Sequence, residues 1–154
     1  THHAYLRQEL PRLDQMTAKV ARVHGDKEPK LLEIRAAFVE LESELMPHML
    51  KEEQILFPII RKLEASTARP EFHCGSVINP IRQMEHEHDH AGDTLKRLRE
   101  LTNDFTPPDW ACNTYRALFD GLRELEVNMH QHVHKENNVL FVKAAELEAC
   151  LQVS

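Results

Sequence analysis

The sequence predicts an all-α protein: an up-down-up-down four-helix bundle made of two helical hairpins related by a pseudo-twofold axis. Composition is the first reason, because 154 residues with 42% hydrophobic residues suffice for one domain with a core. Only 4 residues are Gly and 6% are aromatic, which is too few turn residues for a β-sandwich or barrel. Periodicity is the second reason, since apolar residues recur in four segments at the spacings of three and four that are typical of amphipathic helices.

The first hairpin is expected to pair a helix over residues 1–24 with one over residues 29–65. A loop from Gly25 to Pro29 separates them and places proline where a helix can start. The positions predicted to face the core are His3, Leu6, Leu10, Leu13, Thr17 and Val20 in the first helix, and Leu31, Ile34, Phe38, Leu41, Leu45, His48, Glu52, Ile55 and Ile59 in the second. Three prolines inside these helices are expected to kink or interrupt them: Pro11, Pro47 and Pro58.

The second hairpin is expected to follow a turn-rich connection over residues 66–79. Its helices run from about 80 to 103 and, after the turn Thr106-Pro107-Pro108-Asp109, to about residue 149. Their predicted core positions are Ile81, Met84, His88, Ala91, Leu95 and Leu98, then Leu118, Leu122, Leu125, Met129, His132, Glu136 and Val139.

Every apolar stripe is interrupted at a matching point by His or Glu. Burying an unpaired carboxylate costs several kcal/mol, so such groups are normally paired or bound to metal. The helical register therefore predicts a metal site with at least one ligand from each helix. Its candidate ligands are His3, His48, Glu52, His88, His132 and Glu136.

Two of the helices carry the same His-x-x-x-Glu motif, at His48/Glu52 and His132/Glu136. Residues at i and i+4 share one helix face with Cβ atoms about 5–6 Å apart, so one helix supplies a nitrogen and an oxygen ligand to one site. The motifs are 84 residues apart, and the solitary histidines His3 and His88 are 85 apart. Two equivalent half-sites facing each other predict a dinuclear centre.

The remaining polar residues near these motifs are predicted to lie outside the centre. Two residues turn a helix by about 200°, so the phase of the stripe selects only His88 from its neighbours. Glu53 is expected to be a surface carboxylate or to contact a ligand from outside. His24 is expected to be a helix cap or a residue of a second site rather than a ligand. The histidines expected to face solvent are His86, His90, His130 and His134.

The donor atoms restrict the choice of metal. Imidazole and carboxylate without thiolate exclude iron–sulfur and blue-copper sites and disfavour structural zinc. Two glutamates from opposed hairpins can each bridge a metal pair and leave two histidines for each ion. We therefore expect two iron ions with an oxo or hydroxo bridge. Manganese is the second choice, and a zinc-filled structural bundle is the remaining alternative.

Charge and cysteine content exclude other classes of protein. A formal net charge of −6 argues against a nucleic-acid-binding surface. No apolar run approaches the roughly 18 residues of a membrane span, and no secretory segment is visible. Three well-separated cysteines, Cys74, Cys112 and Cys150, predict reduced thiols in a cytoplasmic protein. We expect neither nucleic acid nor membrane as a partner, and the sequence leaves a homodimer open.

Five blocks of sequence give the chain a family resemblance. It resembles the Repair-of-Iron-Centres (RIC) proteins, a di-iron branch of the hemerythrin-like superfamily. The blocks are Arg7-Gln-Glu-Leu-Pro11, His48-Met-Leu-Lys-Glu-Glu-Gln-Ile-Leu-Phe-Pro58, Met84-Glu-His-Glu-His-Asp-His-Ala-Gly92, Thr106-Pro-Pro108 and His132-Val-His-Lys-Glu-Asn-Asn-Val-Leu-Phe141. The resemblance implies that His3 and His88 are solitary ligands and that the two His-x-x-x-Glu pairs supply the others.

The resemblance also implies a function: repair, in the cytoplasm, of iron–sulfur clusters damaged by nitric oxide or peroxide. The expected partners are damaged or apo iron–sulfur proteins, with O₂ and nitric oxide as small ligands. Family members usually carry an upstream cysteine-bearing domain, which is absent here, so residues 1–154 are expected to form one hemerythrin-like domain.

Three activities stay open at this point. The centre could supply iron to apo-clusters, reduce nitric oxide as an enzyme, or bind O₂ or nitric oxide reversibly as the hemerythrins do. Oxygen-carrying hemerythrins generally use five His and two carboxylates, whereas this set has four His and two Glu. The sequence does not decide between iron donor and reductase.

Overall fold

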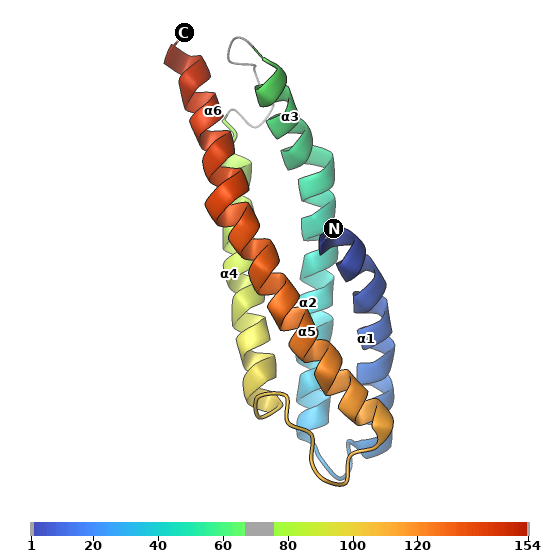
Figure 1. Ribbon diagram of the computed structural model, residues 1–154. Helices are drawn as coiled ribbons and strands as arrows, with labels where there is room; N and C mark the ends of the chain where they lie inside the picture. Colours follow the sequence, from blue (N-terminus) through green and yellow to red (C-terminus); the bar gives the residue numbers. More distant parts are fainter. Residues whose placement is uncertain (1, 67–75, 154) are drawn as a thin grey trace.

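The structure is a computed structural model that describes residues 2–66 and 76–153. Within those residues it contains helices and turns, with no strand. Four long helical rods run alternately up and down (Figure 1), so the predicted four-helix bundle is confirmed. The rods comprise α1 (His2–His24); α2 (Lys30–Lys51), η1 (Glu52–Leu56) and α3 (Phe57–Ala65); α4 (Ile78–Leu101); and α5 (Asn113–Lys135), η2 (Glu136–Leu140) and α6 (Phe141–Val153).

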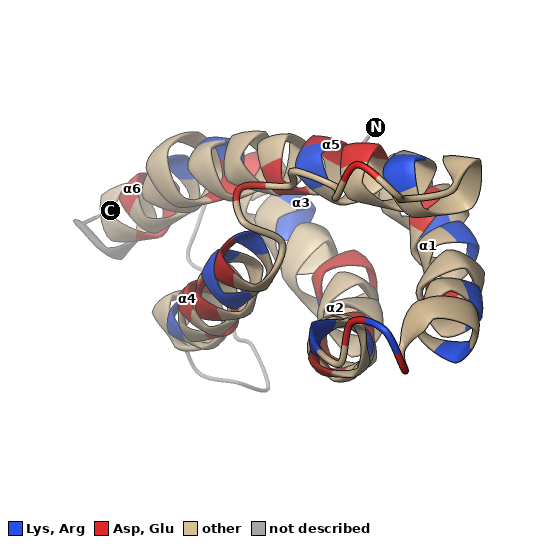
Figure 2. Ribbon diagram, turned by 90° about the horizontal axis from the view of Figure 1, so that it is seen from below, with Lys and Arg blue, Asp and Glu red and all other residues tan. Residues whose placement is uncertain are grey.

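The rods do not form a closed square. Seen along the bundle, α4, α2 and α1 form an arc, and the rod of α5 and α6 lies across it (Figure 2). In the half of the bundle where a loop joins α1 to α2, α5 packs on α1. In the other half its continuation α6 packs on α3. Contacts between α4 and α5 are sparse, so this side of the bundle is its most open one.

Two apolar clusters fill the interior and leave a polar layer between them. The larger one lies between α1, α2, α4 and α5 and includes Leu45, Met49, Ala91 and Met129 at its upper edge. The smaller one begins above the polar layer and consists of Leu56, Ile60, Leu63, Val77, Ile81, Met84, Phe141 and Ala144. Nearly all predicted core positions are buried in these clusters or in the polar layer.

The predicted stripes are wrong at Ile55 and Val139, which are 49% and 60% exposed. The cause is a π-helical turn in each rod, at η1 and η2, where hydrogen bonds close over five residues rather than four. Phe57 N–H donates to Glu52 O, and Phe141 N–H donates to the corresponding Glu136 O. Each wide turn moves the buried face further along the rod. Leu56, one residue after Ile55, and Phe141, two residues after Val139, are therefore buried, and Ile59 is only partly so.

An interruption, one of the two effects expected at proline, does not occur at Pro11 or Pro47. Helices α1 and α2 continue through Pro11 and Pro47. Buried neighbours on both sides of Pro47, Leu45 and Met49, hold α2 in place and offset the lost backbone hydrogen bond. The departure from α geometry falls instead at η1, directly before Pro58.

The connections follow the prediction less closely than the helices do. The connection expected over residues 66–79 lies mostly outside the described residues. The second loop extends past the predicted turn at residues 106–109 as far as Cys112, and α5 begins at Asn113. Three consecutive residues in this loop, Asn103, Asp104 and Phe105, have left-handed φ angles of 51°, 56° and 59°. None of the described helices is long and apolar enough to cross a membrane.

Candidate metal centre

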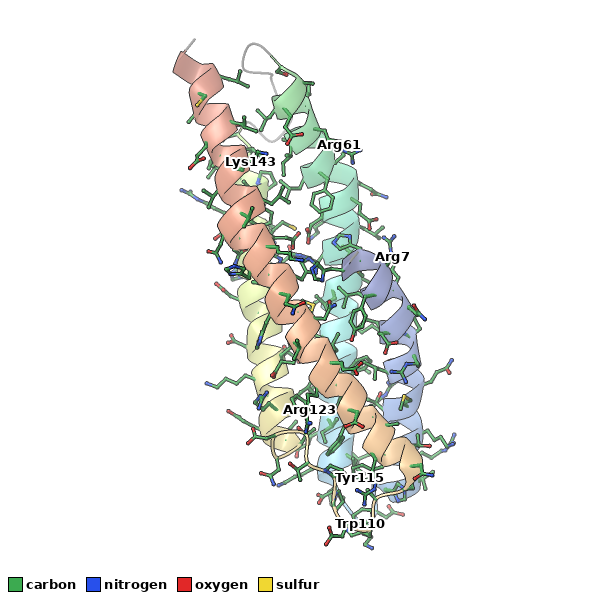
Figure 3. All side chains as sticks on the ribbon, viewed as in Figure 1. Arg7, Arg61, Trp110, Tyr115, Arg123 and Lys143 are labelled. Carbon is green, nitrogen blue, oxygen red and sulfur yellow. The ribbon has the colours of Figure 1, made fainter. Side chains whose placement is uncertain are left out.

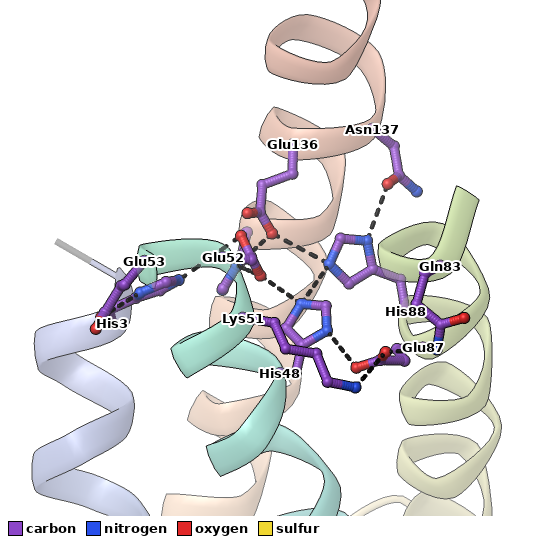
Figure 4. Close-up of polar contacts among 11 residues, drawn as sticks. His3, His48, Lys51, Glu52, Glu53, Gln83, Glu87, His88, Glu136 and Asn137 are labelled. Carbon is purple, nitrogen blue, oxygen red and sulfur yellow. Dashed lines mark hydrogen bonds and ion pairs between the residues drawn. The ribbon is translucent and has the colours of Figure 1, made fainter. Parts of the chain in front are cut away.

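Five of the six predicted ligands meet in the polar layer. His48 and Glu52 come from α2 and η1, and His132 and Glu136 come from α5 and η2. Donor atoms of these four residues and of His88 from α4 all lie within 4.8 Å of one another, and all five residues are buried. Figure 4 shows the two glutamates and the imidazoles of His48 and His88 pointing toward one another, with His48 and Glu52 on one rod and His88 and Glu136 on two others.

Each glutamate is close to imidazoles from two different helices. Glu136 Oε1 lies 2.5 Å from His132 Nε2 and 3.1 Å from His88 Nε2. Glu52 Oε1 contacts His48 Nε2 and lies 3.8 Å from His132 Nε2 in the other hairpin. The Nε2 atoms of His48 and His88 are only 3.0 Å apart. The donor atoms thus surround one common space.

The hydrogen bonds made by the outer ring nitrogens show which inner nitrogens direct a lone pair toward that space. His48 Nδ1–H donates to Glu87 Oε1 at 3.1 Å, and His88 Nδ1–H donates to Asn137 Oδ1 at 2.9 Å. A neutral imidazole carries one proton, so each Nε2 atom then bears a lone pair toward the centre. Metal-binding histidines typically donate their other N–H in this way.

The carboxylates lack the donors that a buried anion needs. No described residue donates a well-formed hydrogen bond to any of the four buried oxygens of Glu52 and Glu136. His132 Nδ1 is likewise buried without a partner among the described residues. Two carboxylates and several inward lone pairs are stable together only around cations, either protons or metal ions. The residues present therefore fit a metal site.

The pKa values of these residues show how burial and neighbouring groups affect their charge. Burial would raise the pKa of the Glu52 carboxyl, but the His132 and His48 imidazoles outweigh it and lower that pKa to about 2. Burial lowers the pKa of the His88 imidazole to about 4. Burial also opposes charge on His48, yet Glu52 and Glu87 raise its pKa. Glu52 is thus an anion and His88 a neutral imidazole at neutral pH.

The sixth predicted ligand, His3, lies at the edge of this group. Its Nδ1–H donates to Glu53 Oε1 at 2.8 Å, and its Nε2 is 3.9 Å from Glu52 Oε2. The outer nitrogen is therefore held and the inner one faces the centre, the pattern seen at His48. Its ring stacks on Phe57 and its side chain is 14% exposed. The structure places His3 beside the five converging residues rather than among them.

Comparison with known proteins places the chain in a family. Residues 1–144 match the Hemerythrin HHE cation binding domain. The chain belongs to the hemerythrin HHE family. It is 43% identical over 143 residues to the iron-sulfur cluster repair protein YtfE of Yersinia pseudotuberculosis (strain IP 31758), which is 93% of this chain and 61% of that protein. It is 42% identical over 142 residues to the protein of that name from Dickeya chrysanthemi (strain Ech1591), 92% of this chain and 60% of that one.

This hemerythrin HHE chain therefore spans about three fifths of the length of the curated relatives it matches. The match covers both His-x-x-x-Glu motifs and His88. The predicted resemblance to iron-centre repair proteins is confirmed at the level of the family and of the relatives' names.

Sequence reasoning missed the residues that hold the imidazoles in place. Glu87 accepts hydrogen bonds from His48, from Lys51 Nζ at 3.1 Å and from Gln83 Nε2 at 2.8 Å. Asn137, next to a predicted ligand, holds His88. Neither lies on an apolar stripe, so periodicity carries no signal for them. Glu53, predicted as a surface or outer carboxylate, accepts from both His3 and Arg7.

The histidines predicted to face solvent are exposed, as expected: His86, His90, His130 and His134. His24 ends α1 at the end of the bundle where α1 and α2 are joined, and its Nε2 lies 3.3 Å from Cys112 Sγ. Figure 3 shows Trp110 and Tyr115 at this end, remote from Arg61 and Lys143 at the other. Cys112 and Cys150 are free and exposed, as predicted, and Cys74 lies outside the described residues.

Proposed function

We propose that this protein holds two iron ions in the buried centre and repairs iron–sulfur clusters damaged by nitrosative or oxidative stress. The observation that carries the proposal is the convergence of two donor-free carboxylates and inward imidazole lone pairs in one buried layer. The names of relatives at 43% and 42% identity supply the repair role. The proposed ligands are His3, His48, Glu52, His88, His132 and Glu136.

Two ions fit this donor set better than one. Glu136 lies against two imidazoles of its own hairpin, and Glu52 lies between His48 and His132 of opposite hairpins. Carboxylates in such positions can each bridge a pair of ions. Imidazole and carboxylate donors suit iron, with manganese as the second choice.

The surrounding residues set the conditions for release or exchange of the ions. Bound iron would supply transferable ions and a redox-active pair that takes small ligands such as nitric oxide. Glu87 and Asn137 fix the ring orientations, and the low pKa of His88 keeps it neutral and able to coordinate. Leu56 and Phe141 close the upper side with hydrocarbon, which limits access of water.

We further propose that the partners are damaged or apo iron–sulfur proteins and that the protein acts in the cytoplasm as one domain over residues 1–154. Iron transfer tests this function directly. The iron-loaded protein, reduced under anaerobic conditions, should rebuild the cluster of an apo-ferredoxin when inorganic sulfide is supplied, and the visible absorption of the cluster follows this step. The His88→Ala variant should transfer less iron, while His86→Ala should match the parent protein. Retention of both irons with no transfer to the acceptor would contradict the repair role.

A cavity favours a second candidate, reversible binding of O₂ or nitric oxide. It has a volume of about 330 Å³, is lined largely by apolar surface that includes Phe57 and Leu140, and reaches His132 and Glu136. A small uncharged gas could enter the centre here. An O₂ adduct that reverts on degassing would favour this role, and formation of N₂O with turnover would instead indicate a reductase.

A further inference from the structure

The candidate ligands of the metal centre include two pairs of neighbouring imidazoles. The Nε2 atoms of His48 on α2 and His88 on α4 are 3.0 Å apart, so these two rings converge on one point. The rings of His3 on α1 and His132 on α5 lie 5.3 Å apart, and their Nε2 atoms are 3.9 and 3.8 Å from the two oxygens of Glu52. Figure 4 shows His3 on the opposite side of Glu52 from His48 and His88. We call the two pairs the α2–α4 position and the α1–α5 position.

Hydrogen bonds from outside fix both rings of the α2–α4 position. Glu87 Oε1 accepts from His48 Nδ1–H at 3.1 Å, and Lys51 Nζ in turn donates to Glu87 Oε2 at 3.1 Å. Asn137 Oδ1 accepts from His88 Nδ1–H at 2.9 Å. The two imidazole side chains are only 3% and 1% exposed. An ion at this position would be held by two buried rings whose orientation is set before it arrives.

Only one ring of the α1–α5 position has such a partner. His3 Nδ1–H donates to Glu53 Oε1 at 2.8 Å, but no described residue hydrogen-bonds to His132 Nδ1. His2 stacks on the His132 ring with centroids 5.3 Å apart, which restricts the ring plane without supplying an acceptor. The His3 side chain is 14% exposed, and one cavity of about 330 Å³ borders both His3 and His132. The α1–α5 position is therefore the less constrained of the two.

This difference in hydrogen bonding has a consequence for metal affinity. An acceptor on the outer nitrogen makes an imidazole more basic and fixes its direction, and losing such a partner typically costs about 10–100-fold in metal affinity. Because one position has two supported rings and the other has one, the two ions should be held unequally. A lower affinity of this kind is expressed chiefly as faster release.

We propose that the ion bound by His3 and His132 leaves the centre first and is the one passed to an acceptor, while the ion bound by His48 and His88 stays longer. The inference rests on the proposed two-iron centre and deepens the proposed repair role, because it names the ion that is transferred. Asn137 and Glu53 are then positioning residues for different ions.

Release of iron to a chelator tests this order. The protein loaded with two irons per chain is reduced with dithionite under anaerobic conditions and mixed with excess bathophenanthroline disulfonate, which binds ferrous iron. We expect two phases of one iron per chain each, with rate constants at least about tenfold apart. Apo-ferredoxin with inorganic sulfide, used in place of the chelator, should likewise take up one iron per chain in the early phase.

Two substitutions identify the ion that each phase reports. Asn137→Ala should speed the slow phase by at least about tenfold without changing the fast phase, and Asn137→Asp, which keeps an acceptor for His88, should restore the slow phase. Glu53→Ala should speed the fast phase alone, because it removes the acceptor of His3. The matched control is His86→Ala, an exposed position on α4 that should release iron as the parent protein does.

Several results would overturn the proposal. These are release of both irons in one phase, a slow phase that Asn137→Ala leaves unchanged, or a slow phase that Glu53→Ala speeds. General loosening of the fold by Asn137→Ala would speed both phases, which would also overturn it. The iron content before mixing separates these failures from failure of the proposed function, since fewer than two irons per chain would contradict the two-iron centre itself.

Discussion

Three of the four imidazoles at the centre are held from outside by a neighbouring side chain; His132, whose Nδ1 has no partner among the described residues, is the exception. Glu87 holds His48, Asn137 holds His88 and Glu53 holds His3. Such contacts fix the ring and direct the other nitrogen inward before any ion arrives. At the scale of single residues, the centre is therefore preorganised by groups that do not themselves coordinate.

Removal of either bridging carboxylate should empty at least part of the centre. We expect Glu52→Ala and Glu136→Ala to lose at least one metal ion per chain and the spectrum of a bridged pair, because each carboxylate contacts imidazoles of more than one helix. His88→Ala should also lose metal, whereas His86→Ala should not. Elemental analysis with an optical spectrum measures this, and two irons with an unaltered spectrum in either glutamate variant would disprove the bridging roles.

Glu42 offers a pH-dependent test away from the centre. Burial and the nearby Asp14 carboxylate raise the pKa of Glu42. The folded protein thus keeps this proton to higher pH than the unfolded chain, so stability is lost as pH rises through the folded pKa. Glu42→Gln should raise the free energy of unfolding at pH 7 by up to about 0.5 kcal/mol.

Urea unfolding at two pH values measures this effect. The gain from Glu42→Gln should shrink as the pH falls toward the ordinary pKa of 4.5, where both states hold the proton. A gain of equal size at pH 7 and at pH 4 would show that charge is not its cause.

At the scale of the helices, periodicity predicted the rods and almost all of their buried faces. It failed after Glu52 and after Glu136 because a fixed period of 3.6 residues assumes an unbroken α-helix. The wide turns η1 and η2 violate that assumption at equivalent places in the two hairpins. The repeated motif carried a partial signal, since the two turns begin at residues that are 84 positions apart.

The candidate metal centre could be predicted from the sequence to about the same extent as the buried faces of the helices. Buried His and Glu residues break an apolar pattern, so the five residues that converge in the structure could be selected from sequence alone. Glu87 and Asn137 could not, because they lie beside the stripes and meet their histidines only after α2, α4 and α5 have packed.

Two glycines in the helix interiors should respond to substitution in opposite ways. A Cβ atom at Gly121 would lie 2.7 Å from Leu13 Cδ2, at a tight contact of α5 with α1. Gly121→Leu should destabilise the protein by about 1–3 kcal/mol through overpacking. Gly92→Ala meets open space and should stabilise α4 by up to about 1 kcal/mol. Chemical unfolding of both variants measures this, and equal stabilities would contradict the tight packing of α1 on α5.

At the scale of the whole molecule, the polar layer divides the core into two apolar clusters joined by four rods. Charged and polar groups in that layer oppose folding unless cations compensate them. Metal binding and the stability of the bundle are therefore expected to be coupled.

Chelation of the metal should lower the thermal midpoint while leaving the helices largely formed. A ligand at a hundred times its dissociation constant stabilises by about 2.7 kcal/mol, which corresponds to a fall of at least about 5 °C on removal. Circular dichroism at 222 nm during heating measures the midpoint. His88→Ala, which should bind less metal, should respond less to the chelator. Identical midpoints for loaded and chelated parent protein would contradict the coupling.

The two π-helical turns also determine how the chain tolerates changes in length. Each wide turn holds one residue more than an ordinary helical turn, so deleting one residue within η1 would restore α-helical geometry and leave the buried face of α3 directed toward α6. The same deletion within α3, before Leu63, would instead rotate the end of that helix by about 100° and turn Leu63 away from α6. Viable length variants of this protein should therefore accumulate in its loops and at the two wide turns, with the α-helical parts of both rods keeping their residue count.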